Sequence, residues 1–384
     1  MINLSNLITG TDIGDFLIIV LLEVFQEFYE KFPILRKEYK AEDTNTTSTQ
    51  ETISLRRKEC LTTVHLLSEI LNWMYIEKGF DEQMNKKVMS IIHYLIKATK
   101  YVLSDISLFD EESKNQAFDK LEILKENIYI GPEHSISRKE RLIKDYVNLN
   151  FTDDFVTNIF SLNKFHSDLL TLRMLNDEKK IVSQTDDLPA YIKRIRSIHV
   201  PLASLQLPLF TKDEHMVRNF AGLGFLIGCE IFRDFEIAGN NFSMDLWLSE
   251  QSYRRYQKLK NDFINNFTQR QNQSQTTSVN DIIADEFGFN VASKAFLLWN
   301  SENIIVDENL PALKMKHLKT FYSVFARIFC SSEESNPQNY ADNKRIFAPN
   351  TERVHKILQN SEWFAKAFQC PKGASMNPQP KVEL

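Results

Sequence analysis

The sequence is poor in cysteine, and its histidines are scattered. The four cysteines stand at positions 60, 229, 330 and 370, without a Cys-x-x-Cys pair. This spacing excludes a structural zinc knuckle. None of the eight histidines forms a His-x-x-x-His pair, so the usual helical zinc motif is also absent. We therefore expect each histidine to be a surface residue or a hydrogen-bonded core residue.

A strongly basic segment is also lacking. The chain has 46 Lys and Arg against 51 Asp and Glu, which gives a formal net charge of -5. This balance argues against nucleic acid, or an acidic membrane surface, as the main partner. Over 384 residues, 43% apolar and 25% charged residues are typical of a globular protein with two or three domains.

Hydrophobic runs long enough to cross a membrane are missing as well. The apolar stretch FLIIVLLEVF begins at Phe16 directly after Asp15 and contains Glu23. It is about half as long as a bilayer requires. No Lys or Arg precedes it and no small-residue cleavage site follows it closely. We expect a buried helix here, with no membrane span and no clear signal peptide.

Helical periodicity dominates the first half of the chain. Apolar residues recur at steps of three and four positions within three segments: 64–74, 88–102 and 153–172. Between them, Asp110 is expected to be the N-cap of a further helix, and Gly131-Pro132 to end that helix. These patterns predict a largely helical protein.

A domain boundary is expected between residues 165 and 190. Polar residues 176–187 predict a loop, which the β-like segment RSIHV follows. We therefore divide the chain into a helical domain, residues 1–175, and a second domain, residues 176–384. The predicted fold class is mainly α with a small β component (α+β).

The segment NFAGLGFLIGCEIFRDF, residues 219–235, combines helical spacing with glycine. Three of the ten glycines of the chain, Gly222, Gly224 and Gly228, lie within it. Each glycine costs a helix about 1 kcal/mol relative to alanine. We therefore expect another part of the protein to approach the backbone of this helix closely.

These segments resemble the neprilysin and endothelin-converting enzyme family of zinc peptidases. NFAGLGFLIGCEIFRDFEIAGNNF is similar to the family's Gly-rich His-Glu-x-x-His helix, and DIIAD to the Glu-Asn-x-x-Asp of its second active-site helix. VPLASLQLPLF resembles a strand of the family, and LQNSEWFAKAFQCPKGASMNP its C-terminal signature. LFDEESKNQAFDKLEILKENIYIG is similar to a helix of its other, helical domain. The resemblance covers the chain from about Arg57 onward. It implies a partial helical lid domain over residues 1–175 and a thermolysin-like, catalytic-type domain over 176–384.

The resemblance places the family's catalytic positions on particular residues. The two ligating histidines correspond to Cys229 and Arg233, and the third ligand, a glutamate in the family, corresponds to Asp281. The catalytic base is kept as Glu230. Asp285 matches the aspartate that orients a ligating imidazole.

Further family positions concern the substrate. By resemblance, Arg353 corresponds to a substrate-binding arginine and Tyr191 belongs to the substrate-binding strand. Leu188 replaces the asparagine of that strand, and Phe347 replaces the histidine that stabilises the oxyanion. Loss of one oxyanion donor typically slows a reaction by about a hundred- to a thousandfold.

Arg233 determines the metal chemistry that we expect. A guanidinium stays protonated and cannot ligate a metal. About 4 Å from a divalent ion, its charge would cost roughly 8 kcal/mol at an effective dielectric constant near 20. Only Cys229 and Asp281 remain as ligands, so we expect no cofactor, although zinc is the cofactor of active family members. We hypothesise instead that Arg233 is the counter-charge of three carboxylates: Glu230, Asp281 and Asp285.

The sequence thus predicts a neprilysin-family homologue that is catalytically inactive and binds peptides or modulates an active family member. The alternative is a divergent zinc-dependent metalloendopeptidase acting on small extracellular peptides, with Cys229, Asp281 and a histidine from elsewhere as ligands. A third interpretation is a truncated product that folds poorly, because the first part of the lid domain and the membrane anchor are unmatched. An extracellular or cell-surface location follows from the resemblance alone.

Overall fold

The computed structural model describes most of the chain from residue 81 onward. The described residues are 65–67, 70, 73–74, 81–130, 140, 143–175, 188–212, 216–236, 247–268, 279–303, 311–330 and 350–382. The predicted helix at Phe16 and the predicted oxyanion position Phe347 lie outside them. Among the described helices, none is both long enough and apolar enough to cross a bilayer.

By its internal contacts, the chain forms two compact units. Unit 1 comprises residues 1–68 and 147–172, and unit 2 comprises residues 69–146 and 173–384. These units do not coincide with the predicted division at residue 175, because residues 69–146 group with the second half of the chain. The boundary at residue 175 between a lid domain and a catalytic-type domain therefore stays a prediction.

The described part of unit 1 is mainly helix α9 (Phe155–Leu175). Asp154 begins it, since its Oδ2 accepts a hydrogen bond from the amide of Thr157 at 2.7 Å. The helix predicted over 153–172 is thereby confirmed. Ile159 and Leu162 are buried, whereas Phe160 is 54% exposed.

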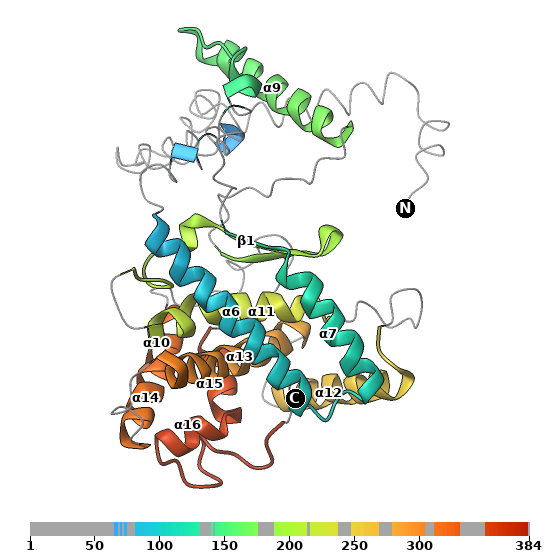
Figure 1. Ribbon diagram of the computed structural model, residues 1–384, viewed down its shortest axis with the longest axis vertical. Coiled ribbons are helices and arrows are strands. Elements are labelled where there is room, and N and C mark those ends of the chain that lie inside the picture. The colour runs from blue at the N-terminus through green and yellow to red at the C-terminus, as the bar shows by residue number, and fades with distance from the viewer. Residues whose placement is uncertain are drawn as a thin grey trace, which may run out of the picture. The chain divides into compact units, whose positions relative to one another are not determined.

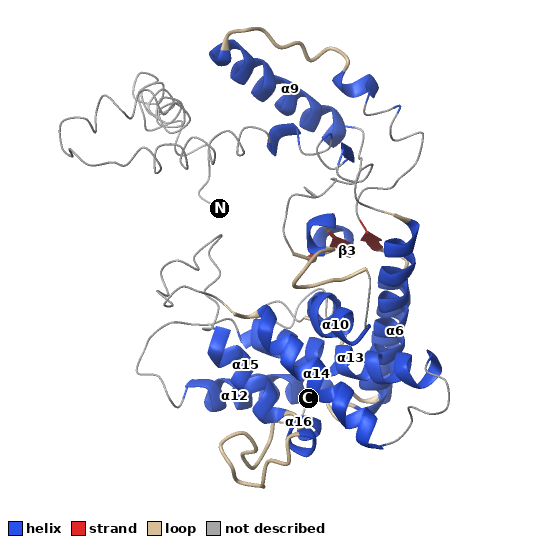
Figure 2. Ribbon diagram, turned by 90° about the vertical axis from the view of Figure 1, so that its left-hand side faces the viewer, coloured by secondary structure: helices blue, strands red, loops and turns tan. Residues whose placement is uncertain are grey.

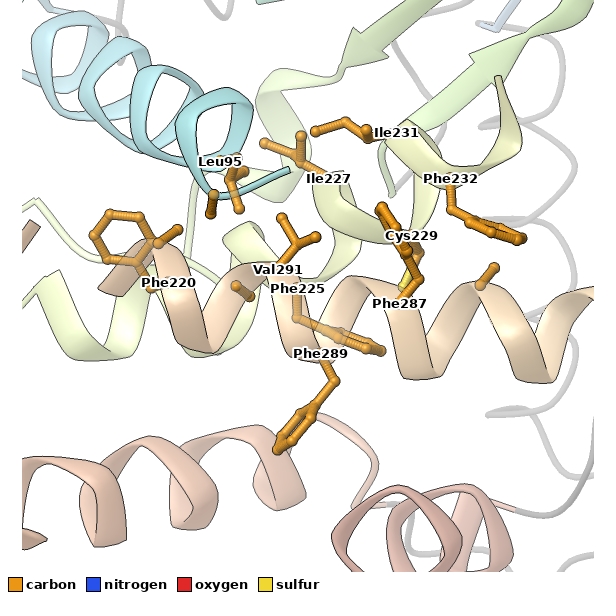
Figure 3. Packing of buried hydrophobic residues seen from close by; sticks show 14 of the residues in the cluster. Leu95, Phe220, Phe225, Ile227, Cys229, Ile231, Phe232, Phe287, Phe289 and Val291 are labelled. Atoms are coloured by element: carbon orange, nitrogen blue, oxygen red, sulfur yellow. The ribbon is translucent and has the colours of Figure 1, made fainter. Parts of the chain in front are cut away.

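Helix α13 (Val279–Asn303) is the central element of unit 2. Helices α6 (Glu82–Asp105), α11 (Phe225–Arg233), α12 (Glu250–Thr268) and α15 (Asn350–Asn360) all contact it (Figure 1). Further helices of unit 2 are α7 (Glu111–Lys125), α10 (Met216–Asn219), α14 (Pro311–Ile328) and α16 (Glu362–Ala367). The core between α6, α11 and α13 is apolar, as Figure 3 shows with Leu95, Ile227 and Val291.

Helix α7 shows both a confirmed and a wrong boundary. Asp110 is its N-cap as predicted, because Oδ1 accepts a hydrogen bond from the amide of Ser113 at 2.9 Å. The helix ends at Lys125, however, and not at Gly131-Pro132. Residues Ile128–Ile130 instead form strand β1, because pairing with a distant strand competes with continuation of the helix.

The small sheet of unit 2 has the order β1-β3-β2. Strand β3 (Ser197–Val200) confirms the predicted β-like segment and pairs in parallel with β1. Strand β2 (Ala190–Ile192) pairs with β3 in antiparallel orientation and forms one edge of the sheet. In Figures 1 and 2 the sheet lies at the opposite end of unit 2 from α16.

The glycines of residues 219–235 permit close backbone approach, as predicted. A Cβ atom on Gly228 would lie 2.9 Å from the carbonyl oxygen of Gly288 on α13. A Cβ atom on Gly222, in the π-helical turn η4 (Phe220–Gly224), would overlap the carbonyl oxygen of Leu209. Gly224 has only ordinary contacts, so the prediction holds for two of the three glycines.

Candidate functional site

The structure brings together the seven residues that the sequence singles out. Helix α11 carries Cys229, Glu230 and Arg233, α13 carries Asp281 and Asp285, α15 carries Arg353, and β2 carries Tyr191. Residues four positions apart lie on one face of a helix, and α11 packs against α13. The side chains of the two helices therefore meet. We call these seven residues the site cluster.

Arg233 forms ion pairs with three carboxylates. Its Nη2 donates to Asp281 Oδ1, its Nε lies 3.8 Å from Glu230 Oε1, and its Nη1 lies 3.5 Å from Glu236 Oε2. The side chain is only 14% exposed, so water screens these pairs weakly. Burial opposes the charge, but Asp281 and Glu230 outweigh it and raise the pKa of Arg233 above its usual value. The guanidinium therefore remains a cation.

Asp285 is paired with a different arginine. Arg353 donates from Nε to Asp285 Oδ2 at 2.7 Å and from Nη2 to Oδ1 at 2.9 Å, in the bidentate arrangement of a strong pair. The hypothesis that Arg233 neutralises Asp285 is therefore wrong, although it holds for Glu230 and Asp281. The reason is geometric, because Asp281 and Asp285 lie one turn apart on α13 and each meets a different helix.

Cys229 is a buried thiol within this charged surrounding. Its Sγ lies 3.8 Å from Asp285 Oδ1, and Figure 3 shows the side chain beside Phe287 at the packed interface of α11 and α13. Burial raises the pKa of Cys229 well above its ordinary value, and the negative charge of Asp285 adds to this effect. The thiol is therefore protonated near neutral pH, whereas the thiolate is the form that ligates metals.

Glu230 and Tyr191 connect α11 with the sheet. Glu230 Oε2 accepts a hydrogen bond from the backbone amide of Tyr191 at 2.8 Å. The phenol of Tyr191 donates to Asp234 Oδ1 at 2.5 Å. Burial, together with the negative charge of Asp234, raises the pKa of Tyr191. Strand β2 is thus fixed to α11 at two positions one helical turn apart.

Three further residues belong to this arrangement and were not predicted from the sequence: Arg196, Asp234 and Glu236. Arg196 donates from Nε and Nη2 to the carboxylate of Asp234 at 3.0 and 2.8 Å, and Glu236 accepts from Asn280 and pairs with Arg233. The spacing of Glu230 and Asp234 by four positions could have indicated Asp234, since both then lie on one helix face. No local pattern indicated Arg196.

Comparisons with known proteins agree on one family. The family model described as "Peptidase family M13" matches residues 190–384, and a second model with the same description matches residues 1–131. Mouse membrane metallo-endopeptidase-like 1 is 28% identical over 346 residues, which is 86% of this chain and 45% of the relative. Human neprilysin is 27% identical over 353 residues, covering 88% of this chain and 46% of its own length. The chain thus spans less than half the length of these relatives.

Solved structures show the same fold. The Mycobacterium tuberculosis zinc metalloprotease Zmp1, in complex with an inhibitor, superposes with a TM-score of 0.68 at 17% identity, covering 86% of this chain and 51% of Zmp1. PepO from Lactobacillus rhamnosis gives a TM-score of 0.66 at 16% identity over 91% of this chain and 53% of its own. The predicted mainly helical, neprilysin-like fold is confirmed by these neighbours.

The family also corrects the expected cofactor. Zmp1 is a zinc metalloprotease and one curated relative is a metallo-endopeptidase by name, so the expectation of no cofactor is wrong: zinc is the cofactor that the family implies. The residues of the site cluster do not fit zinc as arranged. Arg233 is a cation, Cys229 is protonated, and Asp281 and Asp285 each hold an arginine. Within the described segments, no group of three or more His, Cys, Asp or Glu side chains is placed to hold a metal.

Proposed function

Because this chain belongs to peptidase family M13, we propose that it is a non-catalytic member that acts by binding. It holds an extended peptide, or pairs with an active family member, outside the cell or at its surface. The observation that carries the proposal is the ion pair between Arg233 and Asp281. In this ion pair, two side chains at the family's metal-ligand positions bind each other.

The state of Glu230 supports the same proposal. A general base must face the water whose proton it takes. Glu230 instead accepts the amide of Tyr191 through Oε2, and its Oε1 lies 3.8 Å from Arg233 Nε. Both contacts use Glu230 as a fixed structural acceptor.

The proposed location rests on the relatives and on the sequence. One relative carries the word "membrane" in its name, and this chain contains six Asn-x-Ser/Thr acceptors for glycosylation. We also propose that Arg353 and Tyr191 contact a bound peptide at the positions where the family contacts its substrate. Arg353 would have to exchange its pair with Asp285 for a peptide carboxylate or carbonyl.

A rival function has two observations in its favour. Glu230 stands at the family's base position, and the thiol of Cys229 lies close to the carboxylate of Asp285. A divergent zinc-dependent metalloendopeptidase would need these groups and a rearranged Arg233.

Hydrolysis assays separate the two functions. We expect purified wild-type protein to leave internally quenched peptides intact in buffer supplied with zinc, while an active family member cleaves them in parallel. Glu230→Gln, which keeps the size of the side chain but removes its basicity, should give the same background rate. Cleavage by the wild type that Glu230→Gln abolishes would establish the rival function.

A further inference from the structure

The edge strand β2 presents one backbone amide to the outside of the sheet. Tyr191 pairs with Ile198 in the register of β2 and β3. The amide of Ile198 donates to the carbonyl of Asn127 beside β1, so the polar backbone groups of Ile198 point away from β2. Opposed residues of this kind form a non-hydrogen-bonded pair, in which both backbones point outward. The N–H of Tyr191 is therefore directed away from β3, at the edge of the sheet that no described strand covers.

The outward polar groups of an edge strand are a template for an added strand. An extended peptide can pair with the outward N–H and C=O groups of an edge strand, and this β-augmentation is a common mode of peptide recognition. In this chain, however, the outward amide of Tyr191 is already engaged by Glu230 Oε2 at 2.8 Å. The carboxylate takes the position that a peptide carbonyl would occupy.

Glu230 is held in this position by its surroundings. Its side chain is 19% exposed, and Arg233 Nε lies 3.8 Å from its other carboxylate oxygen. The phenol of Tyr191 is bound in turn to Asp234, which Arg196 fixes with two hydrogen bonds. The edge strand is therefore fastened to α11 through its backbone and through its side chain.

We propose that Glu230 is an autoinhibitory cap that keeps the outer edge of β2 closed to extended peptides. The inference rests on the proposed function, in which the protein binds a peptide without cleaving it. A charged acceptor forms a stronger hydrogen bond than a neutral carbonyl. An incoming peptide must therefore displace Glu230 before it can pair with Tyr191, which weakens peptide binding to the resting protein.

Three variants test the cap. Glu230→Ala removes the acceptor, whereas Glu230→Gln keeps a neutral oxygen at the same distance. Glu236→Ala is the matched control, because Glu236 also pairs with Arg233 while its described contacts do not reach β2. Amide exchange at Tyr191 is followed by hydrogen–deuterium exchange with fragmentation. Binding of a blocked, fluorescein-labelled, Val/Thr-rich heptapeptide is followed by anisotropy.

We expect exchange at Tyr191 to be about tenfold faster in Glu230→Ala, the effect of one lost hydrogen bond to a charged group. Glu230→Gln should lie between Glu230→Ala and the wild type, and Glu236→Ala should match the wild type. Peptide affinity should rise about tenfold in Glu230→Ala alone.

If Glu230→Ala leaves the amide exchange at Tyr191 or the affinity for the heptapeptide unchanged, the proposed cap is refuted. If Glu230→Ala fails to fold, amide exchange in the wild type and in Glu230→Gln decides. Fast exchange at Tyr191 in the wild type would refute the proposal. Slow exchange in the wild type that becomes faster in Glu230→Gln would support it. Cleavage of the heptapeptide by the wild type would instead refute the proposed function, and mass spectrometry of the peptide detects it separately.

Discussion

Arg233 is the residue on which the electrostatics of the site cluster depend. Three carboxylates surround its guanidinium, and each would be left without this counter-charge if it were removed. A buried ion pair gives little net stability relative to an apolar pair, but removal of one partner is costly because a charge stays buried. The arginine is therefore required by the carboxylates that it contacts.

Arg233→Ala should lower the free energy of unfolding by about 3 kcal/mol, because Asp281 then stays buried and unpaired. Urea denaturation at pH 7 measures the change. Arg254→Ala serves as the control, since Arg254 pairs with Glu250 on an exposed helix face and should change stability little. A stability equal to that of the wild type would refute the role of Arg233 as counter-charge.

Glu286 is a second residue with a measurable consequence. It is buried beside the cluster on α13 and accepts a hydrogen bond from Asn360 at 2.9 Å. Burial raises its pKa from 4.5 to about 7, against the opposing effect of that hydrogen bond. The folded protein therefore binds this proton more tightly than the unfolded chain does.

The stabilising effect of the protonated Glu286 is complete below pH 4.5 and is lost as the pH rises through about 7. We expect this group to lower the free energy of unfolding by roughly 3 kcal/mol between pH 4.5 and 8. Glu286→Gln should remove that part of the pH dependence, as urea denaturation at pH 5 and pH 8 will show. The exposed Glu362, changed to Gln, provides the control. An identical pH profile in Glu286→Gln and the wild type would contradict the expectation.

At the level of elements, the contact between α11 and α13 positions the site. Gly228 and Gly288 face each other across this contact, so the two backbones approach more closely than side chains would allow. The approach brings Arg233 within reach of Asp281, and Cys229 within reach of Asp285. The geometry of the cluster thus depends on two residues that lack side chains.

Gly288→Ala should destabilise the protein by about 1–3 kcal/mol, because the new methyl group would lie 2.6 Å from the amide nitrogen of Cys229. Thermal unfolding followed by circular dichroism measures it. Gly224→Ala is a matched control, since its methyl group would meet only contacts of 3.4 Å or more and alanine favours a helix. Equal melting temperatures for the two variants would argue against close packing of α11 on α13.

At the scale of the whole molecule, the described parts of the two units differ in how their helices bury apolar side chains. In unit 2, α6, α11 and α13 share one buried core in which Val88, Ile227 and Val291 have no exposed surface. In unit 1, helix α9 buries Ile159 and Leu162 but leaves Phe160 and Leu172 more than half exposed. Segments with little buried apolar surface open at lower free-energy cost.

Hydrogen–deuterium exchange should therefore be slowest in α6, α11 and α13 and faster in α9. The expected difference reflects the number of fully buried side chains on each helix and not the length of the helix, since α9 and α13 are of similar length. Mass spectrometry of peptic fragments resolves these helices. Protection of α9 equal to that of α13 would contradict this account.

Helical period, capping residues and glycine are local signals, and they indicated helices α6, α7, α9 and α11 and the close approach at Gly222 and Gly228. The motifs indicated the family. The sequence by itself also placed the seven residues of the site cluster, through motifs that keep their order along the chain. It could not determine where α7 ends, because β1 forms only by pairing with β3 about seventy residues later.

Which charges meet depends on how the chain folds in three dimensions. Arg353 reaches Asp285 across 68 positions, and the amide of Tyr191 reaches Glu230 across 39. No local pattern contains these distances, since a hydrogen bond depends on where helix packing and strand register place both partners to within a few tenths of an ångström. For the same reason, the sequence identified Arg233 as the counter-charge of Glu230 and Asp281 but wrongly added Asp285 and missed Glu236.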